Sequence, residues 1–155
     1  MIKKQIENLL LKKREKVLIF LYILFFLYLC LMTWEVFIGP YRSFSGTRRY
    51  NLYPFKTIME FILNSKKYSF QVIFINLAAN IITFIPLGFF MSLLFKGHHK
   101  LRNKVGACLL IIIGIEIGQF ILNVGVLDID DVILNMIGGI LGIIVYKVAK
   151  NKMKF

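Results

Sequence analysis

Long apolar stretches alternate with short polar ones along this chain, and the alternation repeats four times. The apolar runs cover residues 17–37, 70–95, 105–126 and 132–148, and the last is somewhat shorter than the others. A helix needs about 20 predominantly apolar residues to cross the hydrocarbon core of a bilayer. The pattern therefore predicts an all-α fold, an integral membrane bundle of four transmembrane helices.

Two shorter segments carry helical patterns of their own. Residues 1–16, MIKKQIENLLLKKREK, predict an amphipathic helix on the cytoplasmic surface, ahead of one membrane domain over 17–155. Within 51–63, Pro54 suits a first helical turn that follows Asn51 or Tyr53. Apolar residues then recur at helical spacing, at Phe55, Ile58, Met59 and Ile62. We expect a short interfacial helix there, and the alternative is a solvated loop helix.

Composition supports a membrane protein. Of 155 residues, 58% are hydrophobic and 18% charged, and the mean hydropathy is +0.72. The net charge of +12 is typical of some nucleic-acid-binding proteins, but here the basic residues flank apolar runs. That placement suits membrane lipids as partners and argues against nucleic acid. Cys30 and Cys108 both lie within apolar runs, too far apart in depth to form a disulfide.

The distribution of Lys and Arg predicts the orientation. If both termini are cytoplasmic, 14 basic residues lie inside, in the N-terminal segment, in residues 96–104 and in the C-terminal tail. Six lie outside, all in the loop 39–69. Because basic residues concentrate on the cytoplasmic side, both termini are expected there. Six outer basic residues are an unusual load, so we expect them to meet acids or anionic ligand groups.

Polar side chains recur on one face of each of the last three predicted spans. They are Asn76 and Asn80 on the second, Glu116 and Gln119 on the third, and Asp131 and Asn135 on the fourth. Glu116 and Asn80 each lie about ten residues, or roughly 15 Å, from the outer end of their span. The spacing predicts one polar cavity, open to the outside and walled by spans two, three and four. Asn135 and the aspartates are expected at its rim.

The cost of these groups favours a function for them. An acidic residue at the centre of a membrane helix costs about 2.5–3.5 kcal/mol on insertion scales. Glu116 therefore needs a partner, for which the neighbouring amides or an arginine of the outer loop are candidates. The alternative is that these groups only join helices through hydrogen bonds.

Three aspartates gather in the gap before the last span, in the sequence DIDD at residues 128–131. Alternating carboxylates can supply oxygen ligands to Mg²⁺ or Ca²⁺, which makes Asp128, Asp130 and Asp131 a candidate metal site. The alternative is a hydrated turn in which Asp131 caps the fourth helix. Spacing alone favours the turn.

Four motifs together resemble the VanZ-like family. They are NLYPFKTI at 51–58, NLAANIITFIPLGFF at 76–90, IEIGQ at 115–119 and DIDDVILNMIGGILG at 128–142. The resemblance covers residues 48–146. It implies a multi-pass protein of the bacterial cytoplasmic membrane, in a family named for a member linked to low-level teicoplanin resistance. Many relatives carry an arginine three residues before the first aspartate of DxDD, where this chain has Gly125.

Two classes of function follow. The first is a non-enzymatic protein that binds an envelope lipid, a lipid-linked wall precursor or the glycopeptide in the outward-facing cavity. Its expected ligand-binding residues are Asn51, Asn76, Asn80, Gln119, Asn135, Arg48 and Arg49. The second is a membrane-embedded enzyme acting on a lipid-linked substrate, with Glu116, Asp128 and Asp131 as catalytic residues. A transporter is a third class, against which the lack of an inverted repeat in four spans argues.

Overall fold

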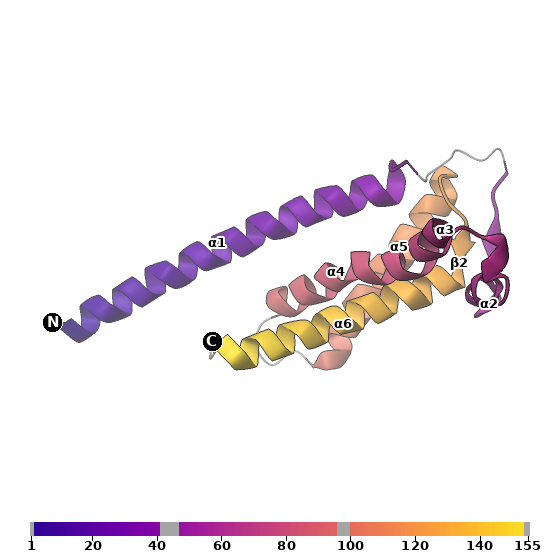
Figure 1. Ribbon diagram of the computed structural model, residues 1–155. Helices are drawn as coiled ribbons and strands as arrows, with labels where there is room; N and C mark the ends of the chain where they lie inside the picture. The colour runs from indigo at the N-terminus through magenta and orange to yellow at the C-terminus, as the bar shows by residue number, and fades with distance from the viewer. Residues whose placement is uncertain (1, 41–46, 96–99, 154–155) are drawn as a thin grey trace.

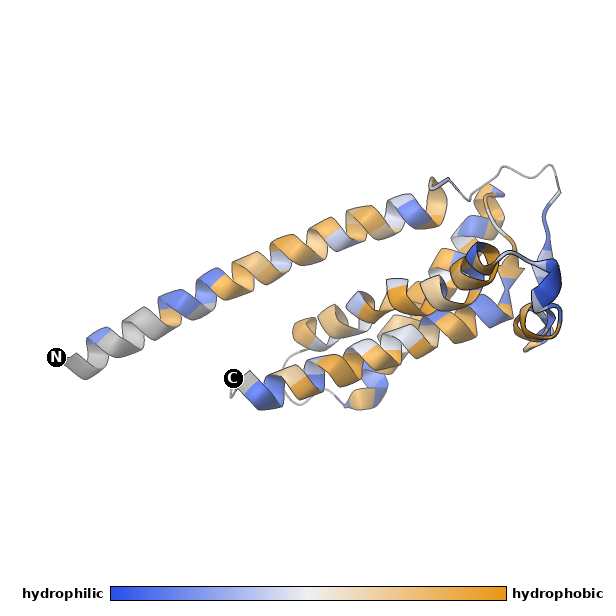
Figure 2. Cartoon of the chain, viewed as in Figure 1, coloured by the Kyte–Doolittle hydropathy of each residue, from blue (hydrophilic) through white to orange (hydrophobic). Residues whose placement is uncertain are grey.

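The computed structural model describes residues 2–40, 47–95 and 100–153. Within them, four helical segments are long and apolar enough to cross a membrane, which confirms the four predicted spans. They are α1 (Ile2–Phe37), the continuous run of α3 (Phe70–Phe74), η2 (Ile75–Ala79) and α4 (Asn80–Leu94), α5 (Leu101–Leu122), and α6 (Ile129–Met153). Hydrophobic residues dominate the long helices, and hydrophilic residues gather toward their ends (Figure 2).

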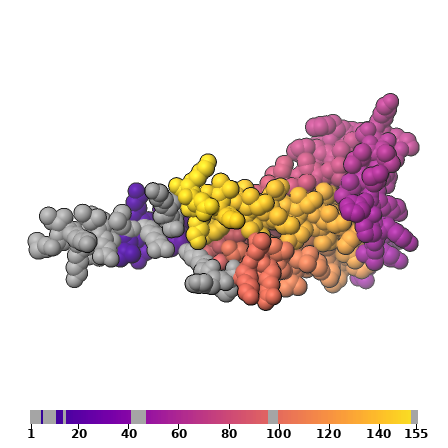
Figure 3. Space-filling view, turned by 90° about the horizontal axis from the view of Figure 1, so that it is seen from below, coloured from indigo at the N-terminus to yellow at the C-terminus, as the bar shows by residue number. Residues whose placement is uncertain are grey.

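The long helices give the molecule two distinct ends. α1 begins and α6 finishes at the same end, as an even number of spans requires (Figure 1). The opposite end, which we call the α2 end, carries α2 (Lys56–Leu63), the short 3₁₀ helix η1 (Ser65–Lys67), β1 (Tyr50–Asn51) and β2 (Leu127–Asp128). Figure 3 shows the same separation, with the magenta segment around α2 far from the yellow end of α6.

The first helix differs from the sequence-based expectation. Residues 2–37 form one continuous helix, with no break between the basic segment 1–16 and the span. No proline or glycine lies between residues 2 and 37, so nothing in the backbone interrupts the helix before Gly39 and Pro40. The part of α1 that qualifies as a span is Leu11–Phe37.

The α2 end also contains a strand pair that the sequence did not predict. β1 and β2 pair in parallel, Tyr50 with Leu127 and Asn51 with Asp128. The Leu127 amide donates to the carbonyl of Arg49 at 3.1 Å. Two-residue strands are too short to produce an alternating sequence pattern. The pairing ties the loop after α1 to the loop before α6.

α2 begins later than Pro54 predicted. Phe55 precedes its first residue and adopts a left-handed conformation with φ 63°. Met59, Ile62 and Leu63 of α2 are 47%, 55% and 72% exposed, an apolar surface that fits a membrane interface. Just beyond α2, the Tyr68 hydroxyl donates to Glu60 at 2.5 Å, and this bond to a carboxylate raises the pKa of Tyr68 above its usual value.

The tightest helix pair is α4 with α6. Gly138 and Gly142 of α6 face backbone carbonyls of α4, and Gly88 of α4 faces Gly139. A Cβ added at Gly142 would lie 1.9 Å from the carbonyl oxygen of Ile85, so only glycine permits this approach. α1 packs more sparsely, burying Met32 and Val36 and bonding the Tyr28 hydroxyl to the Thr83 carbonyl.

Candidate functional site

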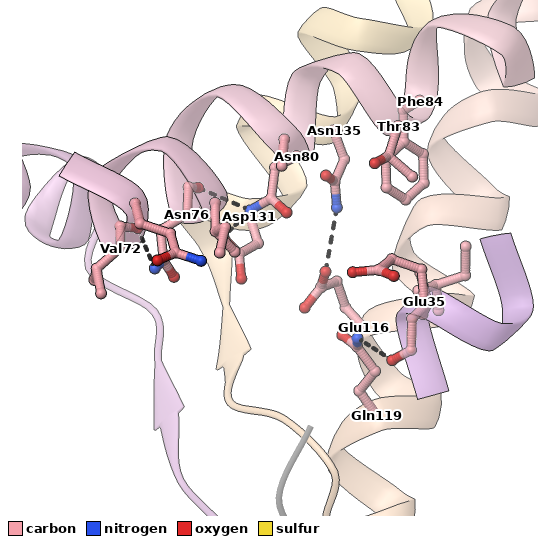
Figure 4. Close-up of a pocket in the computed structure, with 15 residues that line it drawn as sticks. Glu35, Val72, Asn76, Asn80, Thr83, Phe84, Glu116, Gln119, Asp131 and Asn135 are labelled. Carbon is pink, nitrogen blue, oxygen red and sulfur yellow. Dashed lines mark hydrogen bonds between the residues drawn. The ribbon is translucent and has the colours of Figure 1, made fainter. Parts of the chain in front are cut away.

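A pocket of about 420 Å³ lies among α1, α3, η2, α4, α5 and α6. Six of the predicted site residues line it, and Figure 4 shows them together: Asn76, Asn80, Glu116, Gln119, Asp131 and Asn135. The residues that the sequence placed on one face of each span therefore meet around a common space. Whether they bind a ligand stays a prediction.

The π-helical segment η2 shapes one wall of the pocket. Ile75, Asn76 and Ala79 of this segment all line it. A π-helical turn contains an extra residue, widens the helix locally and often occurs at functional sites. Directly after it, the Asn80 side chain donates to the Asn76 carbonyl at 3.0 Å and to Asp131 Oδ1 at 2.7 Å. The wall is thus joined to the first turns of α6.

The deep side of the pocket is formed by α5 and α6. Glu116, Gln119 and Asn135 are each 3% exposed. The Asn135 amide donates to Glu116 Oε1 at 3.3 Å, and the Gln119 amide donates to the Val36 carbonyl of α1 at 2.8 Å. Glu116 therefore has an amide partner, which was one of the alternatives expected from the sequence.

Two depth expectations were wrong. α5 ends at Leu122, and Asn123 turns the chain in a left-handed conformation with φ 58°. Glu116 therefore lies six residues from the helix end, or about 9 Å, nearer the α2 end than expected. Asn135, expected at the rim, is buried beside Glu116 because α6 begins at Ile129 and carries it inward.

α1 supplies a fourth wall that the sequence reasoning missed. Glu35 and Val36 line the pocket, and Figure 4 shows the Glu35 and Glu116 carboxyl groups directed toward the same space. Gln71 of α3 also lines it. A signal existed, because Glu35 is an acidic residue near the end of an otherwise apolar run. Glu35 and Gln71 are exposed, which places them at the pocket opening.

The DIDD aspartates separate into two groups. Asp131 lines the pocket and bonds Asn80, and it lies within α6, so it does not cap that helix as expected. Asp130 is fully buried, and its carboxylate accepts the backbone amides of Phe55, Thr57 and Ile58 at 2.5, 2.8 and 3.1 Å. These are the free amides at the start of α2, which a carboxylate satisfies.

Asp128 also helps to hold the start of α2. It accepts hydrogen bonds from the Thr57 hydroxyl at 2.6 Å, from the Asn51 amide at 3.2 Å and from the Asp130 backbone at 2.9 Å. Asp128, Asn51 and Asp130 do not line the pocket. Among the described residues, no three His, Cys, Asp or Glu side chains are placed to hold a metal ion. A Mg²⁺ or Ca²⁺ site in this cluster remains an untested prediction.

Arg48 and Arg49 are exposed and also lie outside the pocket lining. The Arg48 guanidinium stacks over Phe120 at 5.7 Å and donates to the Ile121 carbonyl at 3.5 Å, at the end of α5. Arg49 contributes its carbonyl to the strand pair. The structure thus places neither arginine beside Glu116.

Four spanning helices around one polar pocket define a multi-pass membrane protein. Residues 19–150 match the model of the VanZ/LLP1 family, and the chain belongs to that family. This confirms the resemblance carried by the four motifs. Protein VanZ of Enterococcus faecium is 39% identical over 74 residues, which cover 48% of this chain and 45% of that relative. The match therefore spans less than half of the relative's length. No solved structure matches the chain.

Proposed function

We propose that this protein binds the polar head of an envelope lipid or of a lipid-linked wall precursor, and thereby contributes to resistance against teicoplanin-type glycopeptides. The observation that carries the proposal is the shared pocket, in which amides and carboxyl groups from separate helices meet. The family membership supports the role in resistance.

Pocket size favours a lipid head over the antibiotic itself. Pockets for small ligands measure roughly 300–1,000 Å³. The pocket here, at about 420 Å³, lies at the smaller end of that range. A glycopeptide antibiotic is far too large to enter it. The head of a lipid fits such a space while its chains stay among apolar surroundings.

The proposed orientation places the α2 end on the outside of the bacterial cytoplasmic membrane, with both termini inside. The excess of Lys and Arg near the termini supports it. In this orientation the pocket opens toward the outer leaflet, and the exposed apolar residues of α2 lie at its interface. Wall precursors and glycopeptides meet on that side of the membrane.

Filling the pocket should abolish protection. Ala79 lines the pocket, so Ala79→Phe places a ring where the head would sit. Expressed in a teicoplanin-sensitive bacterium, this variant should return the inhibitory concentration of teicoplanin to that of cells lacking the protein. The matched control is Gly114→Phe, because Gly114 faces open space with no atom within 4 Å of an added Cβ. Full protection by Ala79→Phe at normal membrane levels would refute the proposal.

A membrane-embedded enzyme is the second candidate, favoured by the three carboxyl groups of Glu35, Glu116 and Asp131 around one pocket. Asp128 is not a catalytic residue in this candidate function, since its carboxylate already accepts hydrogen bonds from Thr57 and Asn51. The same susceptibility assay tests this candidate. Retained protection by Glu116→Gln and Asp131→Asn would exclude acid–base catalysis by these two residues.

A further inference from the structure

The titratable side chains that line the pocket are all acidic. They are Glu35, Glu116 and Asp131, and no Lys, Arg or His belongs to the described lining. The guanidinium of Arg48, at the α2 end, stacks over Phe120 and donates to the Ile121 carbonyl at the end of α5. An anionic headgroup would face three carboxyl groups, and like charges repel. The lining therefore suits a cationic group.

A second observation shows what kind of group fits. The side-chain oxygen Oδ1 of Asn135 is buried and accepts no hydrogen bond from the described residues, although Asn135 is only 3% exposed and points into the pocket (Figure 4). The nitrogen of the same amide already donates to Glu116. A buried acceptor without a donor is costly, about 1–3 kcal/mol. It indicates a ligand that brings N–H or O–H donors.

Three other pocket amides also direct their nitrogens at groups of the protein. The side-chain nitrogens of Asn76 and Gln119 donate to backbone carbonyls at 2.8 Å, and that of Asn80 donates to Asn76 and Asp131. Because these three nitrogens are directed at the protein, the oxygens of the same amides and the three carboxyl groups are acceptors that a ligand can meet. A primary ammonium carries three N–H donors and a positive charge, which matches carboxylates and amide oxygens together.

We propose that the ligand of this pocket carries a primary ammonium group, placed between the carboxyl groups of Glu35 and Glu116 and the Asn135 carbonyl, and that it is the headgroup of an aminolipid. This inference rests on the proposed binding function and specifies its ligand. A lipid is favoured over a soluble amine because exposed apolar residues lie on α3, which lines the pocket: Val72 of the lining is 40% exposed, and Phe70 and Phe74 of the same helix are 81% and 45% exposed.

The single tryptophan provides a probe. Trp34 lies next to Glu35 on α1 and is 55% exposed. The full chain is reconstituted in vesicles that contain phosphatidylcholine and one brominated lipid, and quenching of Trp34 reports binding. The brominated lipid carries a primary ammonium (phosphatidylethanolamine), a trimethylammonium without N–H donors (phosphatidylcholine) or no amine (phosphatidylglycerol). We expect phosphatidylethanolamine to bind on the order of tenfold more strongly than either of the others.

Three variants test whether the preference for phosphatidylethanolamine arises in the pocket. Glu116→Gln and Glu35→Gln should each reduce it severalfold, and Glu35 is exposed, so its substitution does not disturb the core. Ala79→Phe should abolish the preference without changing any charge. The exposed Glu15→Gln is the matched control for loss of one acid and should leave the preference unchanged.

The outcomes separate the two proposals. Equal quenching by phosphatidylethanolamine and phosphatidylcholine overturns the requirement for N–H donors. If the wild type prefers phosphatidylglycerol and Ala79→Phe removes that preference, the ligand is not an aminolipid, but the proposed lipid binding in the pocket still holds. Identical quenching by all three lipids, in the wild type and in Ala79→Phe, overturns both proposals. If soluble phosphorylethanolamine at an equal concentration relieves the quenching, the amine does not need to belong to a lipid, and the proposal of an aminolipid ligand is wrong.

Discussion

Replacing Asp130 by alanine is expected to release α2 from the bundle. The Asp130 carboxylate accepts three backbone amides at the start of α2, from Phe55, Thr57 and Ile58. Each buried amide left without an acceptor costs about 1–3 kcal/mol. The left-handed conformation of Phe55 adds about 1–2 kcal/mol of strain that these bonds offset. These costs oppose the contacts that still hold α2, among them the Thr57 hydroxyl bond to Asp128.

Hydrogen exchange measures this release locally. In Asp130→Ala, the amides of Phe55, Thr57 and Ile58 should lose most of their protection, while amides in the middle of α5 and α6 keep theirs. Asp130→Asn retains one acceptor oxygen but adds an NH₂ group facing backbone donors, so a partial loss is expected. Asp131→Asn is the control, since the Asp131 carboxylate accepts the Asn80 amide of α4, whereas Asp130 accepts the amides at the start of α2. Unchanged protection in Asp130→Ala would show that other contacts hold α2.

Adding one methyl group at Gly142 is expected to destabilise the whole bundle. The new Cβ would lie 1.9 Å from the Ile85 carbonyl oxygen and 2.7 Å from the Phe89 nitrogen. Both are backbone atoms, so α4 and α6 must move apart and lose packing over their entire contact. Overpacking of this kind costs about 1–3 kcal/mol. Gly142→Ala should therefore lower the midpoint of thermal unfolding in detergent.

The control variant is not expected to lower the midpoint of thermal unfolding. Gly106 lies in α5, and an added Cβ there meets no atom within 4 Å. Alanine is favoured over glycine inside a helix by about 1 kcal/mol, so Gly106→Ala should leave the midpoint unchanged or raise it. If both variants shift the midpoint equally, the close approach of α4 and α6 is not a determinant of stability.

The spans were predictable because their signal is large and local. Each apolar run carries its own length and hydrophobicity, and a helix is the structure that satisfies its backbone inside a bilayer. The faces were predictable for the same reason, since helical periodicity places Glu116 with Gln119 and Asp131 with Asn135. These are the polar residues that line the pocket from α5 and α6.

Contacts between distant loops were not predictable. Nothing in the spacing of DIDD distinguishes a carboxylate that faces the pocket from one that accepts the amides of α2. That difference depends on where residues 50–58 fold back, which the strand pair between Asn51 and Asp128 determines. The role of Glu35 was missed because a single acid near the end of a span also fits an ordinary helix terminus. Only the position of α1 against α5 directs its carboxyl group into the pocket.

Cysteine labelling in intact cells tests most directly whether the shared pocket opens on the outside of the membrane. Cys30 and Cys108 are free thiols, so both are first replaced by alanine. Single cysteines are then introduced at Gln71 and Asn76, which line the pocket, and at Arg102 near the opposite end of α5. A membrane-impermeant maleimide should label positions 71 and 76 in intact cells, and position 102 only after permeabilisation. Labelling of position 102 from outside, with positions 71 and 76 protected until permeabilisation, would contradict the account.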